Sequence, residues 1–63
     1  MSILEQKRRE AKLSRRELAD LTGISIRTIE GYEQGLKKTE RMELRTALKL
    51  ADILGFDVRL FIS

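Results

Sequence analysis

The basic side chains of this chain gather in two blocks, and the chemistry they offer is the binding of negative charge. Among its 63 residues, positions 1–16 hold six lysines and arginines against two glutamates, a local charge of +4, and positions 37–49 hold five against two, a local charge of +3. Between these blocks, residues 17–36 have a local charge of −3 and a single basic side chain, that of Arg27. A polyanion contacted along two separated strips fits this pattern, and so does the solubility of small helices.

The residue types on which most enzymes depend are missing from the sequence. It contains no cysteine and no histidine, which excludes disulfides, thiolate nucleophiles and the commonest general base and metal ligand. A chain of this length forms one domain, and so small a domain rarely encloses the deep pocket that a carboxylate or lysine active site needs. We therefore predict a single domain over residues 1–63 that is not an enzyme and takes no metal and no cofactor.

The hydropathy of the sequence predicts a cytoplasmic protein. No apolar run approaches the roughly 18–20 residues that span a bilayer. Near the start, Glu5, Lys7, Arg8 and Arg9 place charge where a secretory signal has its apolar stretch. We expect a chain without a membrane-spanning run, without a secretory signal and without cysteine to be in the cytoplasm and to make no contact with a membrane.

Hydrophobic periodicity and capping residues predict the elements that position these charges. Ser14 and Glu17 form the Ser-x-x-Glu pattern of a capping box, which satisfies two unpaired N–H groups at the start of a helix, and Gly23 ends that helix. Ser25 caps the next helix two residues later, and Gly35 ends it. The second and third helices form a helix-turn-helix over residues 14–35. The predicted helices are 3–11, 14–22, 25–34 and 40–54.

Two predictions are open for the segment after Gly55. Residues 56–60 alternate apolar and polar, and Val, Ile and Phe favour strands, so the pattern slightly favours a strand. Such a strand needs a partner, most simply the same strand of a second subunit. Asp57 could instead cap one last helical turn. We predict an all-α, compact, five-element fold whose last element is a short helix or a C-terminal β-strand that pairs across a dimer.

Several short motifs occur in an order and spacing that are informative together. They are Leu13-Ser14-Arg15-Arg16-Glu17-Leu18-Ala19, Gly23-Ile24-Ser25, Thr28-Ile29, Tyr32-Glu33-Gln34-Gly35 and Leu48-Lys49-Leu50-Ala51-Asp52-Ile53-Leu54-Gly55. Through them the chain resembles the Cro/C1-type (XRE-family) helix-turn-helix DNA-binding domains of phage and bacterial repressors, over roughly residues 3–62. The resemblance implies a lambda repressor-like fold, in which the third helix enters the major groove of DNA.

The resemblance implies which residues contact bases. The positions just after the cap of the third helix are Ile26 and Arg27, and the next position, one turn later, is Gly31. The guanidinium of Arg27 can bond guanine O6 and N7 in a bidentate way. Ile26 either contacts a thymine methyl or packs into the core beside Ile24. Gly31 departs from the family, which usually has a polar or basic residue at this position. Either the backbone approaches DNA closely here, or the sequence specificity is narrower than is usual in the family.

The resemblance also implies contacts with phosphates, made from the start of the second helix, the start of the third and the loop that follows it. Ser25 and Thr28 could donate to phosphates or to bases. These residues also have plainer alternative roles, which are capping for Ser25, helix surface for Thr28 and solubility for each lysine. The predicted phosphate contacts are Ser14, Arg15, Ser25, Thr28, Gln34, Lys37, Lys38 and Arg41.

We expect two further groups of residues to have structural roles. The family pairs the positions of Arg8 and Glu33 in a shielded ion pair, which we expect here. The large apolar groups at the end of the chain exceed what a small monomer can hide, and we predict that they form a dimer interface, with Phe56 and Leu60 also closing part of the core. The predicted interface consists of Phe56, Val58, Leu60, Phe61 and Ile62.

Together these inferences predict a sequence-specific regulator of transcription that binds double-stranded DNA, a repressor that acts as a homodimer on a palindromic operator. A chain this short has no room for a separate ligand-sensing domain, so control by concentration or by a partner is expected. If the tail is a strand, the arrangement is similar to antitoxins of toxin–antitoxin operons, which bind their own promoter and a toxin protein. The alternative from a different class is a protein-interaction module that uses the same helical fold without DNA.

Overall fold

Four α-helices and two short 3-10 helices make up the fold of residues 2–61. The computed structural model describes residues 2–61, and this part of the chain contains no strand, so the all-helical prediction is confirmed. In the same residues, no helix has the length and apolar character needed to cross a membrane. The elements are α1 (Ile3–Glu10), α2 (Arg15–Thr22), α3 (Ile26–Glu33), η1 (Thr39–Arg41), α4 (Leu44–Leu54) and η2 (Val58–Phe61).

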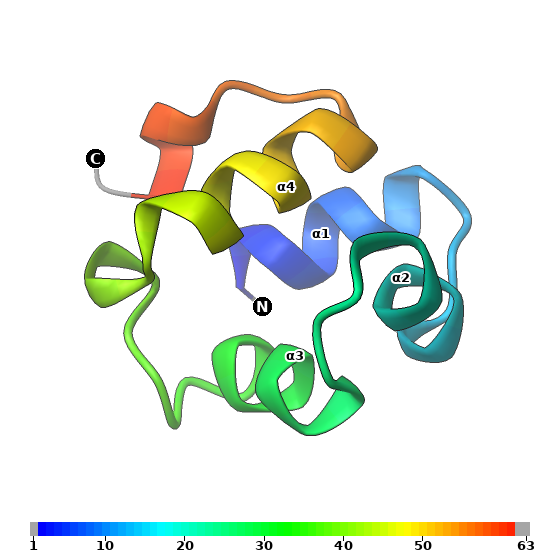
Figure 1. Cartoon of the computed structure of the whole chain (residues 1–63), viewed down its shortest axis with the longest axis horizontal. Helices are drawn as coiled ribbons and strands as arrows, with labels where there is room; N and C mark the ends of the chain where they lie inside the picture. The colour runs from blue at the N-terminus through cyan, green and yellow to red at the C-terminus, as the bar shows by residue number, and fades with distance from the viewer. Residues whose placement is uncertain (1, 62–63) are drawn as a thin grey trace.

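The helices pack in a compact arrangement with extents of 25 × 22 × 22 Å. Helix α3 packs against α1 and α2, whereas α4 packs against α2 and η2. Figure 1 shows the consequence: α3 lies along one edge of the molecule, and α4 with η2 lies toward the opposite edge. One side of α3 is therefore covered by the protein and the other is left open.

Local capping accounts for the bounds of α2 and α3. The Ser14 hydroxyl accepts a hydrogen bond from the Glu17 N–H (3.0 Å), and the Glu17 carboxylate accepts one from the Ser14 N–H (2.9 Å), as the capping box predicts. The bond from the Ser14 N–H holds the pKa of the Glu17 carboxyl below its ordinary value. Gly23, with a φ of 74°, ends α2 in the left-handed region that glycine adopts most easily. Ser25 then caps α3 by accepting a hydrogen bond from the Thr28 N–H.

The longest helix begins at Leu44, so the predicted start at residue 40 is wrong. Residues 39–41 form the 3-10 helix η1, and Met42 and Glu43 are extended before α4 begins. The reason is tertiary: the Thr39 hydroxyl donates to the carbonyl of Phe61 (3.2 Å), and Met42 packs against the core. These contacts hold the segment in a path that a continuous helix would not follow.

Each α-helix contributes one fully buried side chain to the core. These side chains are Leu4, Leu18, Ile29 and Leu50, from α1, α2, α3 and α4 respectively. Apolar groups at one position per helix face the same small interior, so the four helices are held mainly by the removal of this surface from water. A core of this size leaves little stability in reserve.

The tail is a 3-10 helix, and the slight preference for a strand was wrong. The Asp57 carboxylate accepts a hydrogen bond from the Arg59 N–H (2.9 Å), and the Leu60 N–H donates to the Asp57 carbonyl (3.0 Å), so Asp57 starts a final helical turn. This turn directs Phe61 inward, where its ring meets that of Phe56 edge to face with the ring centroids 5.1 Å apart. Two further apolar groups of the tail differ in burial: Val58 is half-buried and Leu60 is exposed.

We predict that Phe61→Ala unfolds most of the protein. Phe61 is 3% exposed and Leu60 is 41% exposed, although they are neighbours in η2. Removal of a buried phenylalanine costs about 3–5 kcal/mol, and the whole stability of a domain this small is about 3–5 kcal/mol. Urea unfolding followed by circular dichroism measures the difference, with Leu60→Ala as the matched control. A loss of stability in Phe61→Ala that is no larger than the loss in Leu60→Ala would contradict the core role of Phe61.

Candidate nucleic-acid interface

The turn between α2 and α3 is held by hydrogen bonds on both sides of Gly23. The buried Thr22 hydroxyl donates to the Leu18 carbonyl (2.8 Å) and accepts a hydrogen bond from the Ile24 N–H (3.2 Å). The Gly23 N–H donates to the Ala19 carbonyl (2.8 Å). These bonds fix the direction in which α3 leaves α2. Sequence reasoning missed Thr22, although a threonine in the last helical turn commonly bonds the carbonyl four residues back.

A buried carboxylate joins the first three helices. Glu33, in the last turn of α3, accepts hydrogen bonds from Arg8 of α1, with Arg8 Nε 2.7 Å from Glu33 Oε2 and Arg8 Nη2 3.1 Å from Glu33 Oε1. Arg15, the first residue of α2, donates through Nε to Glu33 Oε1 (2.9 Å). Arg8 also donates to the Leu13 carbonyl (2.8 Å) in the segment that joins α1 to α2. The charge network therefore includes both arginines and orients α3 relative to α1 and α2.

Arg15 has a structural role that the sequence did not reveal. The resemblance implied a phosphate contact for this residue, and its side chain is 34% exposed beside Glu33. The hydrogen bond to Glu33 holds the guanidinium near the start of α2, and the same bond raises the pKa of Arg15. A contact from Arg15 to a phosphate would therefore be made by a side chain that also supports the fold.

The outer side of α3 is available to a partner. Ile29 and Glu33 are buried on the inner side of the helix, whereas Arg27 is exposed and Ile26 is 41% exposed. Packing of Ile26 into the core, one of the two alternatives for this residue, is not what the structure has. The hydroxyls at the start of α3 bond each other, since Ser25 Oγ lies 2.8 Å from Thr28 Oγ1.

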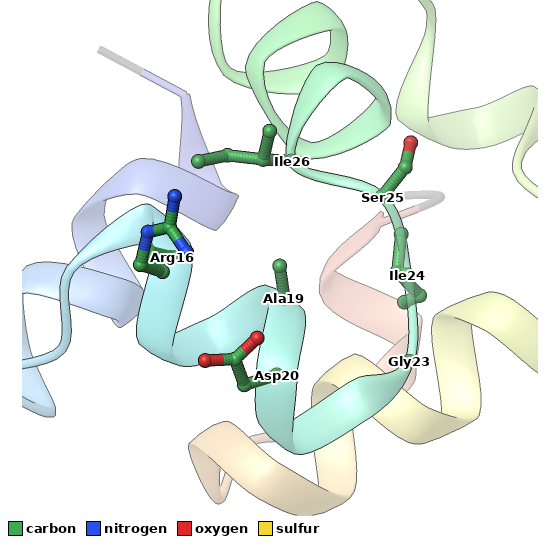
Figure 2. Close-up of a pocket in the computed structure, with 7 residues that line it drawn as sticks. All are labelled: Arg16, Ala19, Asp20, Gly23, Ile24, Ser25 and Ile26. Carbon is green, nitrogen blue, oxygen red and sulfur yellow. The ribbon is translucent and has the colours of Figure 1, made fainter.

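A hollow of about 480 Å³ lies between α2 and the start of α3. Figure 2 shows Arg16, from α2, pointing toward Ile26, from α3, across one side of this hollow, with Asp20 one turn further along α2. Arg16 was not among the predicted contacts. Its spacing of four from Asp20 would have placed both on one face of α2, but only the crossing of the helices brings that face to Ile26.

The loop after α3 carries most of the other predicted contacts. Figure 1 shows α3 between α2 on one side and this loop on the other. The start of α2, with Arg15 and Arg16, and the loop, with Lys37 and Lys38, each hold part of one basic block. Gly31 is buried, and the aliphatic stem of Lys37 covers it. The predicted contacts that are exposed are Ser14, Ser25, Arg27, Gln34, Lys37, Lys38 and Arg41, while Thr28 and Arg15 are half-buried.

The predicted dimer residues divide into three groups. Phe61 is buried within the protomer, and Phe56 and Val58 pack partly against its core. Leu60 alone among the described members of the set is exposed. The remaining member, Ile62, lies outside the described residues. Among residues 56–61, the exposed apolar surface is accordingly smaller than the sequence suggested.

Two helices that are joined by a short turn at Gly23, the second with Ile26 and Arg27 exposed, form a helix-turn-helix. The comparison with protein families agrees: the model for the helix-turn-helix domain matches residues 3–61, and the chain belongs to this family. Membership points to DNA as the partner and to a regulator as the class of protein. Searches of curated proteins and of solved structures gave no match.

We predict that Arg8→Ala destabilises the fold strongly, because it leaves the buried Glu33 carboxylate with one partner fewer. Breaking one side of a buried ion pair costs about 3–5 kcal/mol. Arg9→Ala is the matched control, since Arg9 pairs with Glu5 (2.8 Å) at the surface, where such pairs contribute about 0–1 kcal/mol. Thermal unfolding compares the two variants. Equal melting temperatures for Arg8→Ala and the parent chain would contradict the role assigned to the network.

We predict that acid weakens the fold through Glu33. Burial alone would raise the pKa of this carboxyl, but the hydrogen bonds from Arg8 and Arg15 outweigh it, so the pKa lies below the ordinary 4.5. Because the folded pKa is the lower one, this contribution to stability is complete above about pH 4.5 and is lost as the pH falls through the folded pKa. Carboxyl chemical shifts and urea unfolding at each pH measure the effect.

The control for this prediction is Glu33→Gln, which keeps the shape of the side chain and removes its titration. The free energy of unfolding of Glu33→Gln should fall less on acidification than that of the parent chain. If the two curves run parallel below pH 4.5, or if Glu33 titrates above that value, the carboxylate is not stabilised by the two arginines.

Proposed function

We propose that this chain is a Cro/C1-type (XRE-family) regulator of transcription in the cytoplasm, which binds double-stranded DNA sequence-specifically and represses as a homodimer on a palindromic operator. The observation that carries the proposal is the open outer side of α3, where Arg27 and Ile26 stand exposed at the start of a helix whose opposite side is buried. The aliphatic stem of Lys37 lies over this side at Gly31 and leaves Arg27 and Ile26 exposed.

The dimensions of α3 suit a major groove. The groove is about 12 Å wide and admits one helix with its side chains. An eight-residue helix presents its first turn to the base edges when its N-terminal end enters the groove. Arg27 would then donate two hydrogen bonds to guanine O6 and N7, and Ile26 would contact a neighbouring thymine methyl.

The flanking charges suit the two phosphate backbones of the same groove. Basic residues at the start of α2 lie on one side of α3, and the loop with Lys37 and Lys38 lies on the other. Contacts of this kind position a protein on the duplex and contribute affinity without reading sequence. The capped start of α2, with Ser14 exposed, would add hydrogen-bond donors near a phosphate.

A homodimer would place two copies of α3 on successive major grooves. Half-sites one helical turn apart are separated by about 34 Å, and the longest extent of a protomer is 25 Å, so two protomers side by side can reach both half-sites. The exposed Leu60 and the half-buried Val58 of η2 form the apolar surface that we assign to their contact. Phe61 is not available to it because the protomer core already contains this ring.

The two alternatives, an antitoxin and a protein-interaction module, receive no separate support. The likeness to antitoxins depended on a C-terminal strand, whereas Val58–Phe61 forms a 3-10 helix. A protein-interaction module would not need basic strips on both sides of α3. Electrophoretic mobility shifts with random duplex DNA over a salt series distinguish the classes, because binding through phosphates weakens steeply as salt rises. Binding with no salt dependence, or no binding at all, would overturn the proposal.

We predict that Arg27→Ala relaxes the sequence preference at one base pair of the half-site. The loss of a bidentate contact costs about 1–3 kcal/mol at the cognate base and leaves non-specific affinity nearly unchanged. Selection of bound duplexes from a random pool, for the parent chain and the variant, measures the preference at every position. The same selection gives the half-site and its spacing.

Two control variants make this result specific. Arg59→Ala removes a charge outside both basic blocks, where Arg59 pairs with Asp57 (2.7 Å), and should leave binding unchanged. Lys38→Ala should weaken binding to all sequences alike. Arg15→Ala is unsuitable as a phosphate control because it also disturbs Glu33. If Arg27→Ala and Lys38→Ala act identically, Arg27 does not contact a base.

A further inference from the structure

Gly31 occupies a position in α3 where glycine is not required by the backbone. It lies inside the helix, and the glycines with positive φ are Gly23, Gly35 and Gly55. Glycine destabilises a helix interior relative to alanine. We therefore attribute the glycine at position 31 to the lack of space for a side chain. A Cβ added at Gly31 would stand 3.1 Å from Cδ and 3.2 Å from Cε of Lys37, closer than ordinary van der Waals contact.

The backbone of the loop holds Lys37 in this place. Gly35, with a φ of 79°, reverses the chain after α3. The N–H groups of Leu36 (2.9 Å) and Lys37 (3.1 Å) then both donate to the carbonyl of Gly31. The loop is thus anchored to the same residue that the Lys37 stem covers, and the stem replaces the side chain that Gly31 lacks.

The stem lies on the face of α3 that carries Arg27. Gly31 follows Arg27 by four residues, a spacing that puts two positions on the same side of a helix one turn apart. Lys37 is exposed even though its stem covers Gly31, and among residues 2–61 its ammonium has no carboxylate within 4.0 Å. A flexible, charged head at the end of an anchored stem is thereby presented beside Arg27.

We propose that Lys37 is a specificity-determining residue that contacts a base edge in the groove, one turn along α3 from Arg27. An ammonium only donates hydrogen bonds, so it selects a base whose major-groove edge presents acceptors, guanine above all, and disfavours the amino group of cytosine. Lys37 takes this role from the loop because Gly31 leaves room for its stem. The inference rests on the proposed function, and it assigns to Lys37 a contact with a base in place of a contact with a phosphate alone.

The test compares Lys37→Met, Lys38→Met and Gly31→Ala by selection of duplexes from a random pool. Lys37→Met keeps an aliphatic stem over Gly31 and removes the charge, so it should melt like the parent chain and lose about tenfold in preference at one base pair. That base pair should neighbour the one relaxed by Arg27→Ala. Lys38→Met should weaken all sequences equally.

Gly31→Ala provides an independent readout, because it changes no charge. Its Cβ would displace the Lys37 stem, which is flexible enough to move, so the preference should change at the same base pair as in Lys37→Met. A uniform loss in Lys37→Met, matching that of Lys38→Met, would overturn the inference while the proposed function stands. If the parent chain selects no sequence, the proposed function and the inference about Lys37 are both wrong.

Discussion

The position of the Glu33 carboxylate is the constraint on which the interface depends. A buried charge is unstable without partners, and Glu33 obtains them from Arg8 of α1 and from Arg15 at the start of α2. The hydrophobic core attracts the helices without direction, whereas hydrogen bonds to one carboxylate have direction. The three helices can therefore satisfy Glu33 in few relative orientations, and the adopted one leaves the outer side of α3 open.

Helix α3 combines buried structural residues and exposed residues within eight positions. A helix this short is not stable alone in water, so it depends on the Ser25 cap and on burial of Ile29. Residues on the inner side of α3 form the core and the ion network, so the exposed residues of the outer side are not needed for these contacts. Where α3 lacks a side chain, at Gly31, the following loop covers the gap with Lys37. The recognition surface that we propose therefore includes two segments, α3 and the loop that follows it.

The small size of the domain also limits the apolar surface that it can offer to a partner. A chain of 63 residues has few large apolar groups to spare. Phe61 fills the core beside Phe56, and the bond from Thr39 to the Phe61 carbonyl ties the tail to the loop before α4. Of the tail residues that the structure describes, Phe61 belongs to the core, whereas Leu60 is exposed.

The sequence by itself determined the helices α1 to α3, the turn at Gly23 and the exposed place of Arg27, because caps, glycines and hydrophobic spacing act over a few residues. Only the tertiary structure decided the late start of α4, the helical tail and the bond from Arg15 to Glu33. The Thr39–Phe61 and Arg15–Glu33 contacts join residues 22 and 18 positions apart. Lys37 over Gly31 is closer in sequence, but it depends on how the loop reverses at Gly35. Local sequence patterns do not predict such contacts, because the contacts depend on how all the helices pack together.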